Sequence, residues 1–413
     1  MHLIRPFAGL RPAPGRAVEV IAPPYDVLST DEARVRAAGK PWSFLHISKP
    51  EIGLPVGTSP YASEVYAKAA ENLSLMSSAG ILVRDAVRCY YVYRLIMGTH
   101  TQLGLVAAAS IADYDANRIR KHEFTQPDKE NDRVRQIEAL NAQTGPVMLA
   151  YPHAQEADDL LARASAGAPD TDATADDGVR HALWVVRDAA IAAQLTRTFD
   201  ALPALYIADG HHRSAAASRV AAARCAANPR HTGEENYNTF LAVIFPHHQL
   251  QILAYNRVVA DLNGMDAETF LARVRKNFAV EKSAAPVPPV KPAVFGLYLA
   301  GQWYRLALHR ELIPVSDPIA RLDASLLSDH LLGPVLGITD LRRDQRVDYV
   351  GGSRGLPELE QRVNRGAMAA AFALYPTRMD DLMAVAEAGE VMPTKSTWFE
   401  PKLADGLVSH VLD

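Results

Sequence analysis

The stretch that decides the fold runs from residue 204 to residue 218 and reads Ala-Leu-Tyr-Ile-Ala-Asp-Gly-His-His-Arg-Ser-Ala-Ala-Ala-Ser. Its apolar start alternates as in a β-strand, and the alanine-rich sequence up to Ala227 favours a helix. Gly210 permits a tight turn between the two. We therefore predict a strand over 204–208 and a helix over 212–227, joined by this turn.

The predicted turn has features of a phosphate site. It leaves backbone N–H groups unpaired at a helix start, where the helix dipole also favours an anion. Arg213 adds a planar, charged group suited to phosphate oxygens, and Asp209, His211 and His212 crowd the same turn. The alternative is structural, because Asp-Gly is a common turn and a histidine pair can cap a helix or satisfy core carbonyls.

Length and composition bound the class of protein. The 413 residues predict two or three domains, and 48% hydrophobic with 22% charged residues is typical of a globular protein. A formal net charge of -4 gives no basic surface for nucleic acid. No apolar run reaches the roughly 20 residues of a membrane span. With Cys89 and Cys225 as its only cysteines, we expect a cytoplasmic protein without a disulfide framework.

Two shifts in composition suggest how the chain is divided. Residues 154–178 are rich in Ala and Asp and predict a short helix followed by a solvated loop. Residues 283–292 contain four prolines and predict an extended spacer or a domain boundary. We expect an α+β region over 1–282, with the loop insertion at about 154–178, and a C-terminal α+β region over 293–413.

The order of strand candidates predicts the fold class. Two pairs of neighbouring strands, within 89–111 around Gly98 and within 293–308 around Gly301, have the pattern of hairpins. A further strand is expected over 18–22. These features favour an α+β fold with mixed, partly antiparallel sheets and packed helices over a doubly wound parallel sheet.

The segment 118–135 interleaves six basic with four acidic residues. Such mixed charge indicates either a salt-bridged surface helix or a site that holds an anion and a metal ion together. Pro127 is a good first helical residue, which explains part of the pattern. His122 and Glu123 precede that helix, and a glutamate near an imidazole and several arginines is a candidate general base or metal ligand.

A second polar segment lies at 392–403, where two prolines exclude an ordinary helix and predict a loop with a defined conformation. Lys395-Ser396-Thr397 is similar to the end of a P-loop, but the glycine-rich part is missing. We expect these three residues to complete a nucleotide pocket. The alternative is that the segment is an ordered tail, which Trp398 and Phe399 hold against the rest of the protein by packing.

Two smaller patterns leave alternatives open. Tyr25 and Asp26 follow Pro23-Pro24 and either contact a ligand or form an ordinary turn. His247-His248 is most simply the tip of a hairpin, and its spacing from the histidines of the Gly210 turn gives no specific metal-ligand pattern.

The motifs taken together resemble the bacterial and archaeal family catalogued as domain of unknown function 1015, from the first residues to the last. The segments that carry the resemblance are Arg5-Pro6-Phe7, Ala22-Pro23-Pro24-Tyr25-Asp26-Val27, Lys121-His122-Glu123-Phe124-Thr125 with Asp132-Arg133, Ala208-Asp209-Gly210-His211-His212-Arg213, and Met392 to Thr397 with Phe399-Glu400-Pro401-Lys402.

The turn also resembles the ParB and sulfiredoxin superfamily, which includes the free serine kinases. Gly210, Arg213 and Ala216 fill the Gly-x-x-Arg-x-x-Ala pattern with which that superfamily binds nucleotide phosphates. The resemblance implies a phosphate-binding turn and, on the kinase branch, a carboxylate base. The sulfiredoxin cysteine is absent from the turn, so reduction of sulfinic acids is not expected.

We therefore expect a phosphotransferase that uses ATP or ADP with Mg²⁺ to phosphorylate a small hydroxylated metabolite, with free L-serine as the leading candidate. The expected roles are phosphate binding by Gly210, Arg213, Lys395, Ser396 and Thr397, metal binding by Asp209, charge neutralisation by His211 or His212, proton removal by Glu123, and substrate contact by Tyr25, Asp26 and His122. The alternatives are a phosphoester hydrolase with a catalytic histidine and a non-enzymatic nucleotide-binding module. Neither a nucleic acid nor a membrane is an expected partner.

Overall fold

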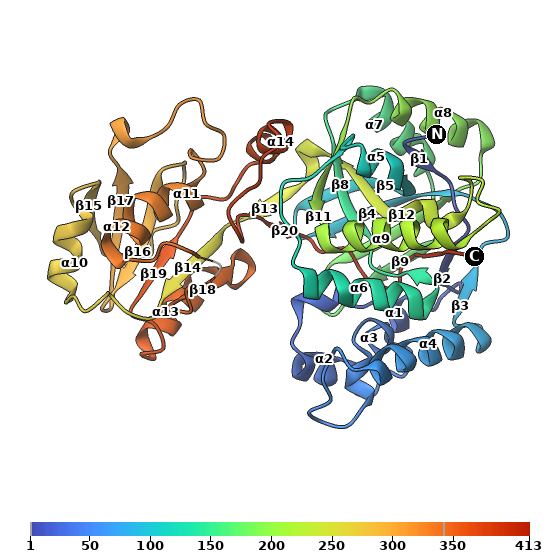
Figure 1. The fold of residues 1–413 in the computed structure, drawn as a ribbon, viewed down its shortest axis with the longest axis horizontal. Coiled ribbons are helices and arrows are strands. Elements are labelled where there is room, and N and C mark those ends of the chain that lie inside the picture. The colour runs from blue at the N-terminus through green and yellow to red at the C-terminus, as the bar shows by residue number, and fades with distance from the viewer. Residues whose placement is uncertain (1, 342) are drawn as a thin grey trace. The chain divides into compact units, whose positions relative to one another are not determined.

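The computed structural model describes residues 2–341 and 343–413. The chain divides into two compact units, with Met1–Leu250 and Pro401–Asp413 in unit 1 and Gln251–Glu400 in unit 2. Both ends of the chain therefore belong to unit 1, as Figure 1 shows. The proline-rich stretch 283–292 lies inside unit 2, where it connects two strands, and the chain passes between the units at residues 250–251 and 400–401 instead.

Unit 1 is built on a mixed sheet that contains nine strands among the described residues. Strands β8 and β12 are parallel, as are β6 and β11, and the other neighbours are antiparallel. In spatial order the strands are β6 (Ile119–Arg120), β11 (Leu205–Asp209), β8 (Val147–Tyr151), β12 (Thr239–Pro246), β5 (His100–Ser110), β4 (Tyr90–Met97), β10 (Arg180–Val186) and β9 (Thr171–Thr174), with β1 (Ile4–Arg5) also on β5.

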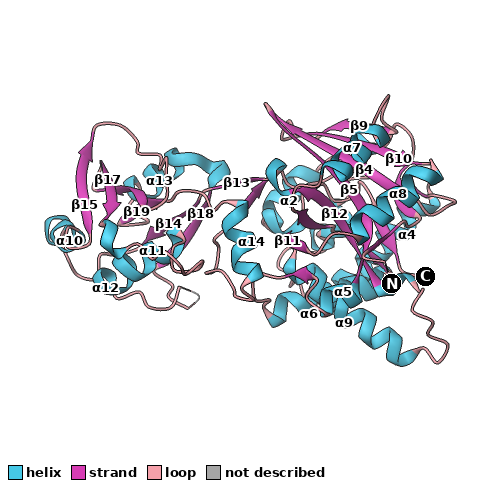
Figure 2. Cartoon of the chain, turned by 90° about the horizontal axis from the view of Figure 1, so that it is seen from above, coloured by secondary structure: helices cyan, strands magenta, loops and turns pink. Residues whose placement is uncertain are grey.

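Alternate residues of these strands build one hydrophobic core. Because side chains alternate between the faces of a strand, Tyr90 and Val92 share a face and join one cluster with Leu160 and Phe199 from neighbouring helices. The helices that contribute to this cluster are α5 (Ile111–Asp115), α7 (Gln155–Ala164), α8 (Ala189–Asp200) and α9 (His211–Ala227). Figure 2 shows the strands in magenta with the helices in cyan beside them.

A smaller part of unit 1 packs helices against a second, antiparallel sheet. Its strands in order are β3 (Leu82–Arg84), β2 (Gly9–Pro12), β21 (Ser409–Val411) and β7 (Ala142–Gln143), so the C-terminal strand lies between β2 and β7. The helices are α1 (Ala17–Val20), α2 (Thr30–Ala37), α3 (Leu45–Ser48), α4 (Ser63–Ser78) and α6 (Pro127–Leu140), with short 3₁₀ turns at η1 (Tyr25–Val27) and η2 (Pro50–Gly53). Two further 3₁₀ turns, η3 (Asn236–Asn238) and η4 (His247–Gln249), flank β12 of the large sheet.

The strand expected over 18–22 is wrong, because Ala17–Val20 forms α1. Ala17 and Val20 are the buried residues of this segment, while Val18 is exposed. The buried residues are three positions apart, which is the spacing of one helical face and not that of a strand.

Unit 2 has an antiparallel sheet of six described strands and a two-stranded ribbon. The sheet order is β15 (Phe278–Ser283), β17 (Gln302–Leu308), β16 (Val294–Leu299), β19 (Ala370–Ala373), β14 (Tyr255–Val259) and β18 (Val347–Gly351), and the ribbon pairs β13 (Gln251–Leu253) with β20 (Trp398–Glu400). The helices are α10 (Ala267–Val274), α11 (Asp323–Leu327), α12 (Gly333–Leu336), α13 (Gly355–Asn364) and α14 (Met379–Glu387), with shorter turns at η5 (Arg310–Leu312), η6 (Ser328–Leu332) and η7 (Gly352–Arg354).

The expected α+β class with mixed, partly antiparallel sheets is confirmed. The two predicted hairpins are β4–β5 and β16–β17. Three local predictions differ. The C-terminal loop contains strand β20, and the solvated loop expected before residue 178 contains strand β9, which pairs with β10. His247-His248 is not a hairpin tip, since β12 and β13 pair with different sheets. None of the helices in the described residues combines the length and the apolarity that crossing a bilayer requires.

Candidate functional site

The turn between β11 and α9 depends on Gly210. Its φ is 107°, a conformation that residues with a side chain rarely adopt. A Cβ atom added there would lie 3.1 Å from Arg213 Cζ and 3.3 Å from Val147 Cα. The backbone angle therefore favours glycine at this position, and the close approach of Arg213 leaves little room for a side chain.

The first turn of α9 directs backbone N–H groups out of the helix. The N–H groups of Arg213 and Ser214 both donate to Gly210 O, at 2.9 and 3.0 Å. Those of His211 and His212 precede the first bonds within the helix. Because α9 extends over 17 residues, its dipole adds partial positive charge at this end. The start of α9 is thus suited to an anion.

Arg213 fixes the turn and carries charge. Its Nη1 donates to Pro146 O, and its Nη2 lies 3.6 Å from Asp209 Oδ2 and 3.9 Å from Asp26 Oδ2. Burial opposes the charge, but the two carboxylates outweigh it and raise the pKa of the guanidinium. Asp26, which follows two prolines near the N-terminus, is thereby brought to the Gly210 turn.

Asp209 is held between two cations. Lys402 Nζ lies 3.5 Å from the same Oδ2 atom that faces Arg213. Burial disfavours ionisation, but Lys402 and Arg213 together hold the pKa of the carboxyl below its usual value. Lys402 is not among the site residues predicted from the sequence, although it ends one of the family segments.

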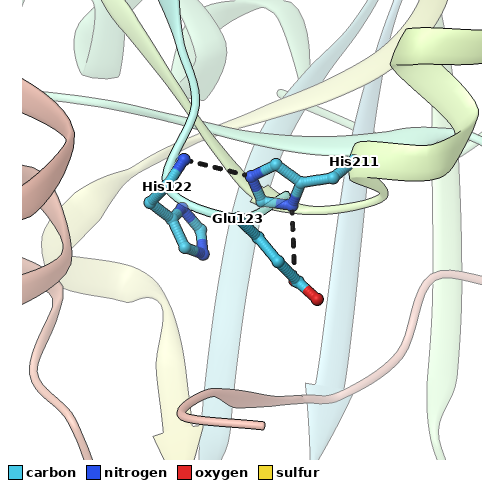
Figure 3. A group of neighbouring side chains, drawn as sticks. All are labelled: His122, Glu123 and His211. Atoms are coloured by element: carbon cyan, nitrogen blue, oxygen red, sulfur yellow. Dashed lines mark hydrogen bonds and ion pairs between the residues drawn. The ribbon is translucent and has the colours of Figure 1, made fainter. Parts of the chain in front are cut away.

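His211 connects the turn with His122 and Glu123, as Figure 3 shows. His211 Nε2 accepts a hydrogen bond from the backbone N–H of His122 at 3.3 Å, and Nδ1 lies 3.7 Å from Glu123 Oε2. Burial and then the neighbouring His122 hold the pKa of His211 well below its ordinary value, so the ring is neutral at pH 7. With Nε2 as the acceptor, the ring proton is on Nδ1 and faces Glu123.

This tautomer matters for metal binding. One ligand atom each from His122, Glu123 and His211 lies within 4.8 Å of the others, which is a candidate metal cluster. A metal ion on His211 Nδ1 would require the proton on Nε2, where it would face the N–H of His122. The hydrogen bonding therefore favours a role in which His211 orients the half-exposed Glu123 carboxylate.

The other two histidines of the site are also neutral. Burial lowers the pKa of His122 to about 4, and its Nδ1 has no hydrogen-bond partner among the described residues. Burial, followed by Lys129, lowers the pKa of His212 to about 4, and its Nε2 accepts from Gln126 N at 3.0 Å. Burial therefore favours the neutral rings of His211 and His212, and a role for either in charge neutralisation stays a prediction.

Tyr25 lies against Arg133, a residue from the mixed-charge segment. The Arg133 guanidinium carbon is 3.8 Å from the centre of the Tyr25 ring, and Arg133 Nε donates to Asp132 Oδ2 at 2.9 Å. Burial raises the pKa of Tyr25 to about 12, so its hydroxyl is neutral. The pair forms one wall of a pocket beside the turn.

This pocket contains about 470 Å³ of space, including the part open to solvent. Among its lining residues are Tyr25, Ser48, Arg133, Arg213 and Asp405. Asp405 is 2% exposed, and burial raises the pKa of its carboxyl to about 7. Neither Asp405 Oδ1 nor Ser48 Oγ has a hydrogen-bond partner among the described residues. Neither Ser48 nor Asp405 could be selected from the sequence, since no local pattern distinguishes them.

Lys395-Ser396-Thr397 belongs to unit 2. Lys395 Nζ lies 5.7 Å from the centre of the Tyr255 ring, Ser396 Oγ donates to Pro393 O at 2.6 Å, and Thr377 Oγ1 donates to Ser396 O at 2.8 Å. The loop is therefore well anchored within its own unit. A role for these three residues in nucleotide binding stays a prediction.

The fold and the site define a mixed α/β protein in which a strand, a glycine turn and a helix bring carboxylates, two cations and helix N–H groups together. A family profile described as "Protein of unknown function (DUF1015)" matches residues 4–325. The chain belongs to this family, as its motifs indicated.

Solved structures give distant similarities, and no curated protein matches the chain. A conserved hypothetical protein from Pyrococcus furiosus is 14% identical, with a TM-score of 0.34 over 70% of this chain and 90% of that chain. A free serine kinase in complex with AMP is 12% identical, with a TM-score of 0.34 over 68% and 84%. SbnI with a C-terminal truncation, from Staphylococcus aureus, is 12% identical, with a TM-score of 0.38 over 73% and 85%.

Proposed function

We propose that unit 1 binds nucleotide phosphates at the Gly210 turn and transfers a phosphoryl group to a small hydroxylated metabolite, with free L-serine as the first candidate. The observation that carries the proposal is the convergence of three distant segments on this turn. Asp26, Glu123 and Lys402 come from separate parts of the chain, and each lies within 4 Å of a residue of the turn.

The phosphate would lie at the start of α9. The N–H groups of His211 and His212 point out of the helix there, and Arg213 and Lys402 supply permanent positive charge beside them. Phosphoryl transfer needs positioning and charge stabilisation more than covalent chemistry from the protein. The charged groups of the turn meet that need, and the neutral histidines would contribute hydrogen bonds.

Mg²⁺ fits the oxygen donors of the site better than its nitrogen donors. Mg²⁺ prefers carboxylate and phosphate oxygens, and Asp209 is held ionised by its neighbours. Asp26 faces the same guanidinium and is the second candidate ligand. When bound, the ion would neutralise charge on the phosphate oxygens of ATP or ADP.

Glu123 is the candidate base for the acceptor hydroxyl. Its side chain is 43% exposed, so a substrate can reach it, while His211 Nδ1–H faces its carboxylate. In the proposed reaction Glu123 takes the hydroxyl proton, the acceptor oxygen forms a bond to the terminal phosphorus, and the shortened nucleotide leaves. Tyr25 and His122 would contact the acceptor.

The test is a direct assay for transfer. The full chain is incubated with L-serine, Mg²⁺ and either ATP or ADP, and phosphoserine and the shortened nucleotide are measured by mass spectrometry. A panel of other small alcohols replaces serine in parallel reactions. Absence of nucleotide binding, together with absence of transfer to every acceptor, would contradict the proposal.

The same assay distinguishes the alternatives. A hydrolase that uses a histidine nucleophile needs a free imidazole nitrogen, whereas Nε2 of both His211 and His212 accepts from a backbone N–H. Release of phosphate from phosphoserine without nucleotide would support that alternative. Nucleotide binding without turnover would support a regulatory module.

A further inference from the structure

His153, Asp158 and His248 form a side-chain cluster at one edge of the large sheet in unit 1. Strands β8 and β12 are parallel, with Tyr151 opposite Pro246. Because parallel strands end at the same edge, the segments that follow them come together there. These segments carry His153 and His248, and Asp158 lies in the first turn of α7.

The cluster is separate from the Gly210 turn. Strand β11 runs antiparallel to β8, and Asp209 pairs with Met148 near the start of β8. The turn therefore lies beyond the start of β8, whereas His153 follows its end. A strand of this length separates the two places by about 15 Å.

The distances within the cluster suit a metal ion. His153 Nδ1 lies 3.2 Å from Asp158 Oδ2, and the rings of His153 and His248 have their centres 5.1 Å apart. One ligand atom from each of the three residues lies within 4.8 Å of the others. Two ligands of a tetrahedral ion with bonds of about 2.0–2.1 Å are about 3.3 Å apart, so His153 and Asp158 already have the required spacing.

A buried tyrosine supports the carboxylate. Tyr151 OH donates to Asp158 Oδ1 at 2.6 Å, which orients the carboxylate and leaves Oδ2 facing His153. Carboxylates that bind metal ions are commonly held by such an outer hydrogen bond.

The geometry points to a site for a divalent transition-metal ion of the Zn²⁺ class, ligated by His153, Asp158 and His248. Imidazole nitrogen favours Zn²⁺ and its neighbours over Mg²⁺ or Ca²⁺. Three protein ligands leave a fourth position for water or an anion. The His153 side chain is 52% exposed, so an ion reaches the site from solvent.

The test uses the full chain without an affinity tag, stripped of metal with a chelator. Zn²⁺ is titrated by calorimetry, and Co²⁺ is titrated by visible absorption, which distinguishes four-coordinate from six-coordinate ions. We expect one ion per chain, with a four-coordinate Co²⁺ spectrum. His153→Ala and His248→Ala should each weaken binding at least about tenfold, and Tyr151→Phe should weaken it less.

The chain offers a matched control in His231. His231 Nδ1 lies 3.2 Å from Glu235 Oε2, the same imidazole–carboxylate spacing, and no metal cluster among the described residues includes it. His231→Ala should therefore leave the affinity unchanged. The inference is overturned if the stripped chain binds neither ion, if the His153 and His248 variants bind as the wild type does, or if His231→Ala weakens binding equally.

Discussion

Lys402 Nζ lies 3.5 Å from Asp209 Oδ2, so the last segment of the chain supplies a cation to the turn at the end of β11. The position of Lys402 depends on Pro401–Asp413 returning to unit 1, where β21 pairs with β2 and β7. Unit 1 therefore needs both ends of the chain to complete its site.

Replacement of this lysine tests its role. Lys402→Met should weaken the binding of ADP about tenfold, because it removes one charge-assisted contact without removing the aliphatic part of the side chain. Titration calorimetry at neutral pH measures the loss. Lys68→Met, on α4 and paired with Glu71, is the control and should bind like the wild type. Equal affinities for the wild type and Lys402→Met would exclude Lys402 from the phosphate site.

Arg213→Lys should impair both folding and binding. A lysine cannot reproduce the planar guanidinium that donates to Pro146 O while it faces Asp209 and Asp26. We expect a loss of about 1–3 kcal/mol in the unfolding free energy of unit 1 and weaker ADP binding. Arg219→Lys, two turns further along α9 and paired with Glu130, should change neither quantity much. A variant that binds ADP normally would show that Arg213 has only a structural role.

Glu123→Gln separates binding from chemistry. The amide keeps the shape of the side chain but cannot take a proton, so nucleotide affinity should be retained while turnover falls by about 10²–10⁴-fold. Single-turnover rates and calorimetry on the same preparation measure the two effects. Glu64→Gln, at an exposed position on α4, is the matched control. Unchanged turnover in Glu123→Gln would mean that another group removes the proton from the acceptor hydroxyl.

The strand, the turn and the helix around Gly210 could be predicted from the sequence because local residues decide them. Leu205–Asp209 and His211–Ala227 agree with the expected elements to within one residue. The β16–β17 hairpin is local in the same way, since Gly301 adopts a φ of 78° at its turn.

The remaining parts of the site depend on contacts between distant segments. Lys402 and Asp405 reach it through the pairing of β21, which joins residues from opposite ends of the chain. No local pattern gives that pairing. The neutral state of His211 and His212 could not be predicted either, since it follows from burial of the rings in the folded chain.

Gly210→Ala should be more damaging than an ordinary glycine replacement. Alanine would have to adopt a φ of 107°, and its Cβ would press against Arg213 Cζ. Gly80→Ala is the control, because Gly80 also has a positive φ, 69°, but no atom within 4 Å of the added Cβ. We expect Gly80→Ala to lower the free energy of unfolding by about 1 kcal/mol through backbone strain. Gly210→Ala should lower it further and should also weaken ADP binding. Equal losses of stability, with ADP binding intact, would mean that the close approach of Arg213 is unimportant.

Asp405 should make the stability of unit 1 fall as the pH rises. Its carboxyl titrates at about 7 in the folded chain because it is buried, whereas an unfolded aspartate titrates at about 3.9. Between these values the folded state binds the proton and the unfolded state does not, so the unfolding free energy decreases with increasing pH. Above pH 7 the decrease in unfolding free energy that is due to Asp405 levels off at about 4 kcal/mol.

Asp405→Asn removes this titration and keeps the shape of the side chain. The variant should gain stability relative to the wild type as the pH is raised from about 4 to about 8, measured as the difference between urea unfolding curves of the unit 1 transition. Other titrating groups, including the buried histidines whose lowered pKa values act in the opposite direction, cancel in that difference. Since Asp405 Oδ1 has no partner among the described residues, the amide breaks no hydrogen bond at that atom. A stability difference that is constant over this range would show that the Asp405 carboxyl is already ionised in the folded chain, held by Arg213.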